Sequence, residues 1–148
     1  MEWKIKKNRF DATYLKINIE FEPKNDVLRY TLAQVKISNF PEFIFFQATS
    51  KTYSEEHVYI MNYLEMDWED KLWAKNVKGE EMKKEEMFLV HDVMGETIIE
   101  ELLFDKLLLD YGTILKEVYH NDNTLSDSWN DEMGKALEKL RLKIEIKG

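Results

Sequence analysis

The sequence predicts an α+β domain in which an N-terminal antiparallel sheet of about four to six strands packs against two C-terminal helices. Residues 13–22 alternate between apolar and polar side chains, the pattern of a strand with one buried face. Residues 97–120 and 127–145 instead carry apolar side chains three or four positions apart, as buried helices do. A length of 148 residues fits a single domain of this kind, spanning residues 1–148.

The sheet is expected to begin near the N-terminus. Trp3 to Ile5 is expected to form an edge strand, and the alternating strand at 13–22 ends at turn-forming residues 23–26. A further strand is expected over 27–37, where the apolar side chains change from one parity to the other. That change predicts a β-bulge near Leu32, because a bulge inserts one extra residue into a strand.

The middle of the chain is expected to complete the sheet. Phe43 to Ala48 is almost entirely apolar, as in a strand that is covered on both faces. Residues 54–77 fit a helix by the spacing of their apolar side chains. His57 to Leu64, however, is rich in Tyr, Val and Ile, which favours a strand there and a second one near Leu72 to Val77. The sheet is therefore expected over about residues 3–77, with helix as the alternative for 54–77.

Two helices are expected to follow, at about 97–120 and 127–145. The apolar stripe of the first is wider than that of an ordinary amphipathic helix, so this helix should be largely buried. Gly112 within it marks either a break or a position of close packing. Residues 140–146 also alternate and would permit a strand, but no turn residue separates them from the helix. We therefore expect the second helix to continue to its end.

The composition excludes several classes of protein. The chain has no cysteine, which excludes a disulfide scaffold and a thiolate zinc site. Its apolar runs are far shorter than the roughly 20 residues needed to span a bilayer. Charged residues recur from Glu2 onward, so no apolar region of a signal peptide can form. We expect a soluble, cytoplasmic protein.

Charge is unevenly distributed along the chain. The net charge is −8, yet residues 1–53 carry +3, residues 54–134 carry −14 and residues 135–148 carry +3. The segment from Ser54 to Asp70 holds six acidic residues and no Lys or Arg. Like charges packed this closely repel one another and oppose folding, and a cationic partner would remove that repulsion. A solvated face that promotes solubility is the alternative interpretation.

No motif in the sequence predicts catalysis. The three histidines match no zinc-hydrolase spacing, the glycines form no phosphate-binding loop, and acidic stretches fail the requirements of a calcium loop. We therefore expect a non-catalytic protein with no cofactor and no bound metal. The enzyme alternative is a carboxylate and histidine metal site around His91, with Asp92 and Glu96.

Aromatic residues coincide with the acidic segment, and this coincidence predicts a partner-binding surface. Interfaces draw much of their binding energy from a few aromatic and charged residues near the centre. The predicted surface consists of Glu55, Glu56, Tyr63, Glu65, Asp67, Trp68, Glu69, Asp70 and Trp73. These rings could alternatively be half-buried parts of the core.

The function expected from these features is capture of a cationic protein partner. In size and charge the chain resembles the small, acidic, cysteine-free, single-domain immunity proteins of bacterial toxin systems. That resemblance implies an inhibitor that covers the positive cleft of a partner such as a nuclease toxin. An acidic DNA-mimic inhibitor is the alternative. Binding to nucleic acid or to a membrane is not expected, and the sequence leaves the oligomeric state open.

Overall fold

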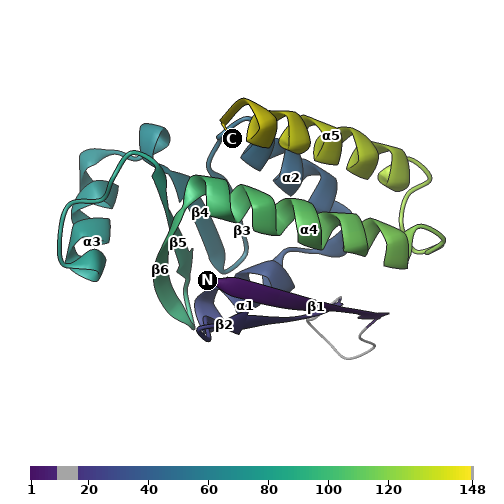
Figure 1. Cartoon of the computed structure of the whole chain (residues 1–148), viewed down its shortest axis with the longest axis horizontal. Helices are drawn as coiled ribbons and strands as arrows, with labels where there is room; N and C mark the ends of the chain where they lie inside the picture. The colour runs from purple at the N-terminus through teal and green to yellow at the C-terminus, as the bar shows by residue number, and fades with distance from the viewer. Residues whose placement is uncertain (10–16, 148) are drawn as a thin grey trace.

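Two antiparallel sheets and five α-helices make up residues 1–9 and 17–147, the part of the chain that the computed structural model describes (Figure 1). The α+β class is confirmed. The strands are divided between a sheet of two strands and a sheet of four, rather than joined in one N-terminal sheet. The four-stranded sheet also extends well beyond residue 77, where it was expected to end.

The two-stranded sheet is formed by β1 (Glu2–Arg9) and β2 (Ile17–Glu22), as the alternating pattern predicted. Residues 13–16 of the predicted strand lie outside the described residues. The apolar side chains of β2 are buried in the main core. The indole of Trp3 donates a hydrogen bond of 2.8 Å to Asp110, which attaches β1 to the long helix α4 (Glu101–Tyr119).

The prediction of a strand with a bulge over 27–37 was wrong. This segment forms α1 (Asp26–Gln34), followed by a short 3-10 turn, η1 (Ile37–Asn39). The side chain of Asn25 caps the helix by accepting a hydrogen bond of 3.0 Å from the backbone N–H of Leu28. The apparent change of parity has a simple cause, because buried residues recur every three or four positions on one face of a helix.

The predicted central strand at 43–48 was also wrong, since these residues belong to α2 (Phe40–Ala48). Pro41 lies in the first turn, where its fixed φ favours a helix and its missing N–H costs no hydrogen bond. The buried side chains of α2 are Phe40, Pro41, Phe43, Ile44, Gln47 and Ala48. Phe40, Phe43, Ile44 and Ala48 belong to the main core, which explains why so short a helix is so apolar.

The four-stranded sheet is an antiparallel meander in the order β3-β4-β5-β6. Its strands are β3 (Tyr53–Glu55), β4 (Val58–Asn62), β5 (Glu86–His91) and β6 (Gly95–Glu100). The strand expected between residues 57 and 64 is thereby confirmed in β4. The strand expected near Leu72 to Val77 was wrong, because those residues lie in α3 (Trp68–Lys78).

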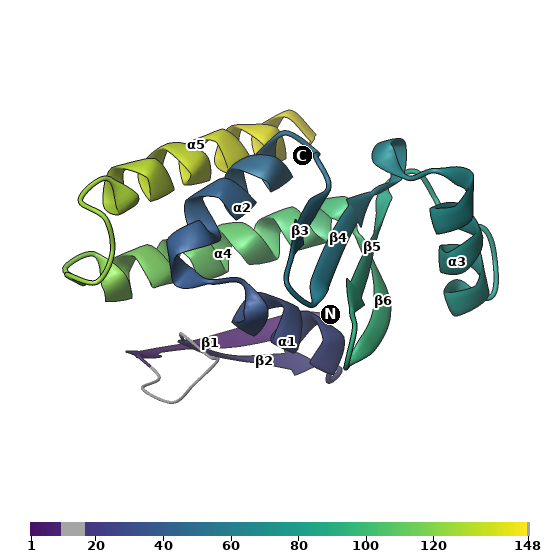
Figure 2. The same ribbon diagram turned by 180° about the vertical axis from the view of Figure 1, so that it is seen from behind.

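The meander has a hydrophobic core on each face. One face contributes to the main core, which also takes in α1, α2, α4 and α5 (Trp129–Lys147). The other face carries a smaller cluster made of Met61, Met66, Ala74, Met82, Phe88 and Val90, which we call the second core. Figures 1 and 2 show α3 on this second face, at the end of the molecule away from the other helices.

The two C-terminal helices are confirmed in type and approximate position. The first begins later than expected, because residues 97–100 belong to β6 and the chain passes directly from that strand into α4. Residues 140–146 are helical, as expected, within α5. Figure 2 shows α5 lying along α2. Within residues 1–9 and 17–147, no helix combines the length and apolar character that crossing a bilayer requires.

Gly112 lies where α4 meets both α2 and α5. A Cβ atom there would come within 2.8 Å of Leu137 Cδ2 and 2.9 Å of Ile44 Cδ1. Gly134 on α5 is a matched glycine with room, since a Cβ atom there would lie 3.5 Å from Lys116 Cε. Close packing, rather than a helix break, is therefore the role of Gly112.

The two glycines should respond oppositely to the same substitution. Gly134→Ala should raise the free energy of unfolding by about 0.5–1 kcal/mol, because alanine favours the helix. Gly112→Ala should lower it by about 1 kcal/mol, because overpacking outweighs that gain. Urea unfolding followed by circular dichroism measures both. Equal stabilisation of the two variants would contradict the close packing at Gly112.

Candidate functional site

The predicted partner-binding segment folds into α3 and the turn before it. Asp67 and Asp70 form a capping box at the start of this helix. The Asp67 carboxylate accepts a hydrogen bond of 2.8 Å from Asp70 N–H, and the Asp70 carboxylate accepts one of 3.3 Å from Asp67 N–H. The helix ends at Gly79, whose φ of 85° favours glycine. Two predicted binding carboxylates therefore also define where α3 begins.

One face of α3 holds the helix on the sheet. Ala74 is fully buried, and the Trp73 ring meets Phe88 of β5 edge to face with a centroid separation of 5.2 Å. The Trp73 indole also donates a hydrogen bond of 3.3 Å to Glu96 on β6. Trp73 therefore contacts the second core through Phe88, although 40% of its surface remains exposed.

The opposite face of α3 presents apolar side chains to solvent. Trp68 and Leu72, which are four positions apart and so lie on one helical face, are 72% and 49% exposed. Leu64, in the 3-10 turn η2 (Tyr63–Glu65) before the helix, is 85% exposed. Large apolar groups left this accessible on one short segment are typical of an interaction site. We call Leu64, Trp68 and Leu72 the α3 surface.

Carboxylates lie close in sequence to the residues of the α3 surface. Residues 64–73 contain four acidic residues and one lysine, and the ammonium of that lysine, Lys71, lies 4.3 Å from the centroid of the Tyr63 ring. Glu65 accepts a hydrogen bond from the backbone N–H of Thr52, whereas Glu69 points from the exposed side of the helix. The exposed indole thus lies in a region of negative charge.

Glu55 and Glu56 lie apart from the α3 surface. Glu55 and Glu56 precede β4, whereas the residues of the α3 surface follow it. The five residues of β4 therefore separate the two glutamates from the α3 surface by about 17 Å. Glu55 accepts hydrogen bonds from Lys36 N–H, the Asn39 amide and the Tyr53 hydroxyl, at 2.9, 3.1 and 2.7 Å. Its role is therefore structural, and burial together with this carboxylate raises the pKa of Tyr53.

The residues of the alternative metal site are engaged separately. His91 Nδ1 accepts hydrogen bonds from the backbone N–H groups of Val93 and Met94, and Glu96 accepts one from Trp73. Asp92 lies 2.7 Å from His57 Nδ1. Within residues 1–9 and 17–147, no group of three or more histidine and carboxylate side chains is arranged to hold a metal ion.

The pKa values of His57 and His91 are shifted in opposite directions. The hydrogen bond that His57 donates to the Asp92 carboxylate raises the pKa of His57, which is exposed, whereas burial lowers the pKa of His91. As pH falls, His57 therefore takes up its proton before His91 does.

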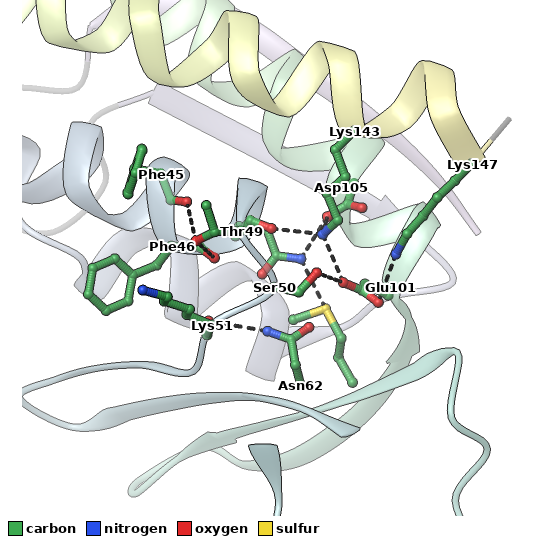
Figure 3. A network of polar contacts seen from close by, with 12 residues as sticks. Phe45, Phe46, Thr49, Ser50, Lys51, Asn62, Glu101, Asp105, Lys143 and Lys147 are labelled. Carbon is green, nitrogen blue, oxygen red and sulfur yellow. Dashed lines mark hydrogen bonds and ion pairs between the residues drawn. The ribbon is translucent and has the colours of Figure 1, made fainter. Parts of the chain in front are cut away.

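A buried ionic network joins α2, α4 and α5, and sequence analysis did not anticipate it (Figure 3). Lys143 Nζ donates to the Gln47 carbonyl, Glu101 and Asp105 at 2.7, 2.8 and 3.0 Å. Gln47 also donates to Asp105 at 2.6 Å, and Ser50 donates to Glu101 at 2.9 Å. The partners are up to 96 positions apart in the sequence, so no local pattern could have revealed the network.

This ionic network has a structural role. The Lys143 ammonium has three N–H donors and three acceptors, and the Asp105 side chain is fully buried. Burial raises the pKa of Asp105 despite its bonds to Gln47 and Lys143. Burial would also raise the pKa of Glu101, but the bonds from Lys143, Lys147 and Ser50 together lower it. These contacts fix three helices to one another.

Comparisons of the chain with protein-family models, with curated proteins and with solved structures found no match. Its function is therefore argued from the geometry described above.

Proposed function

We propose that this protein is a non-catalytic binding module that captures a cationic protein partner through the α3 surface. The observation that carries the proposal is the exposure of Trp68 and Leu72 on the outer face of a helix whose other face is packed on the sheet. Tryptophan is among the residues that most often dominate binding energy. An apolar centre with polar surroundings is the usual anatomy of a protein interface.

The negative charge of the protein supports a partner that is positively charged. The four carboxylates of residues 64–73 and the net charge of −8 attract a basic surface and accelerate its association. A nuclease carries a positive cleft for phosphate, and a bacterial nuclease toxin held inactive in the cytoplasm is a partner of this kind. The protein would then act as its immunity protein.

The proposal predicts that the α3 surface is required for capture. Trp68→Ser with Leu72→Ser should weaken capture of the basic partner at least about tenfold, because the apolar centre of the interface is lost. The measurement is a quantitative pull-down from the native host, read by mass spectrometry. Repeating it at about 0.05 and 0.3 M salt should show weaker capture at high salt, since screening reduces charge attraction.

A matched control is available on α5. Leu142 and Ile146 are also four positions apart, and they are 46% and 86% exposed. Leu142→Ser with Ile146→Ser should leave capture unchanged. The proposal fails if this control variant loses the partner while the α3 variant retains it, or if the captured protein is acidic. Asp67 and Asp70 should not be replaced in this test, because they cap α3.

A further inference from the structure

The turn between β3 and β4 brings His57 opposite Asp92, just beyond the end of the paired part of β4 and β5. The pair at that end is Val58 with His91, and the Asp92 N–H continues the contact by donating a hydrogen bond of 3.0 Å to the His57 carbonyl. The φ of His57 is 73°, a left-handed conformation that favours glycine. A histidine at such a position calls for an explanation, and its side chain supplies one.

The imidazole of His57 lies between two carboxylates. Its Nδ1 is 2.7 Å from Asp92 Oδ2, and its Nε2 is 3.4 Å from Glu56 Oε1. Only the protonated ring can donate a hydrogen bond from both nitrogens, since the neutral ring has one donor and one acceptor. In the neutral state one ring nitrogen would therefore face a carboxylate with no proton between them. The arrangement suits the imidazolium better than the neutral ring.

His57 sets the charge at this point of the molecule. Among the described residues, no other cation forms an ion pair with either carboxylate. His91 of β5 and Tyr30 of α1 line one cavity with His57, and the other residues that line it are uncharged. As pH falls, His91 takes up its proton after His57, because burial lowers the pKa of His91. The side chain of His57 is 42% exposed, so it exchanges its proton readily with solvent.

We propose that His57 is a proton-operated clasp, in which its imidazolium is held by Glu56 and ties the turn between β3 and β4 to Asp92 in the turn between β5 and β6. β3 lies at the edge of the sheet and is joined to β4 over three residue pairs. The clasp therefore strengthens the attachment of a short edge strand. Loss of the proton leaves two neighbouring carboxylates without a cation between them, and their repulsion loosens the turn. The clasp is separate from the α3 surface, which follows the other end of β4.

The clasp should hold at low pH and release at high pH. The hydrogen bond to Asp92 raises the pKa of His57 above its ordinary value of about 6.5. A group whose folded pKa is raised contributes stability that is fully present below its unfolded pKa. That contribution is lost as pH rises through the folded pKa. Release of the clasp is therefore expected above about pH 6.5.

The amide proton of Asp92 reports on the clasp, because it bonds to the His57 carbonyl. Hydrogen exchange is measured by NMR in the purified protein without a partner, so the result does not depend on capture through the α3 surface. Corrected for the intrinsic rate, protection of this amide should be at least about threefold lower at about pH 8 than at about pH 6. The ring protons of His57 should titrate with a midpoint above about 6.5. Protection that does not fall with pH, or a midpoint at or below about 6.5, overturns the proposal.

Three variants locate the effect at His57. His57→Gly should keep the turn, since glycine favours its φ, and should abolish the pH dependence of Asp92 protection. Asp92→Asn should lower the titration midpoint of His57 toward about 6.5. His120→Gln is the matched control, because His120 is also exposed but its Nδ1 lies 2.7 Å from the Glu117 carbonyl rather than beside a carboxylate. This control should change neither measurement. A pH dependence that persists in His57→Gly or disappears in His120→Gln overturns the clasp, as does a midpoint that Asp92→Asn leaves unchanged.

Discussion

Lys143→Met should lower the free energy of unfolding by about 3–5 kcal/mol, because it leaves the fully buried Asp105 carboxylate without its cation. The same change also removes a hydrogen bond to the Gln47 carbonyl and one to Glu101. The methionine fills much of the space of the lysine stem, so loss of charge pairing dominates over loss of packing. Urea unfolding at pH 7 measures the effect.

Two further variants separate pairing from packing. Lys147→Met should cost less than about 1 kcal/mol, because Lys147 is half-exposed and its pair with Glu101 is screened by solvent. Adding Asp105→Leu to Lys143→Met should restore much of the lost stability, because no unpaired charge then remains buried. A loss below about 1 kcal/mol in Lys143→Met would contradict the structural role of the network.

The effect of Lys143→Met should also depend on pH. Burial raises the pKa of Asp105, and removing the cation raises it further. An acid whose folded pKa is raised contributes stability below its unfolded pKa, and that contribution is lost as pH rises through the folded pKa. The destabilisation by Lys143→Met should therefore be smaller near about pH 4 than at pH 7.

Periodicity predicted the long helices of this chain better than the short ones. The long helices were predicted correctly because nineteen residues each give many turns of the apolar stripe. The short helices α1 and α2, with nine residues each, were mistaken for strands because the parity pattern over 27–37 and the apolar run at 43–48 also fit strands. Tertiary burial, not propensity, stabilises such short helices.

The candidate surface could be predicted only in part. The coincidence of aromatic and acidic residues located the segment that forms the α3 surface. Sequence could not show that Trp68 is more exposed than Trp73, because that difference depends on the contact between Trp73 and Phe88. It also could not show that Asp67 and Asp70 cap the helix, because a capping role depends on where the helix begins.

Phe88→Ala should release α3 from the sheet while leaving the main core folded. Phe88 is fully buried in the second core and supports the ring of Trp73. Replacing a buried phenylalanine by alanine costs about 3–5 kcal/mol. We expect Phe88→Ala mainly to lower the free energy of local opening of α3, because that helix is held mainly by this small cluster. Native-state amide hydrogen exchange of α3 and α4 measures it.

Phe104→Ala is the matched control, because Phe104 is equally buried but belongs to the main core. This variant should reduce protection in all helices together, whereas Phe88→Ala should reduce it chiefly in α3. A uniform loss in Phe88→Ala would show that the two cores unfold as one unit. If α3 opens alone in Phe88→Ala, this variant should capture the cationic partner more weakly, although no residue of the α3 surface has changed. Bound partner should then restore the protection of α3, since a ligand stabilises the state that it binds.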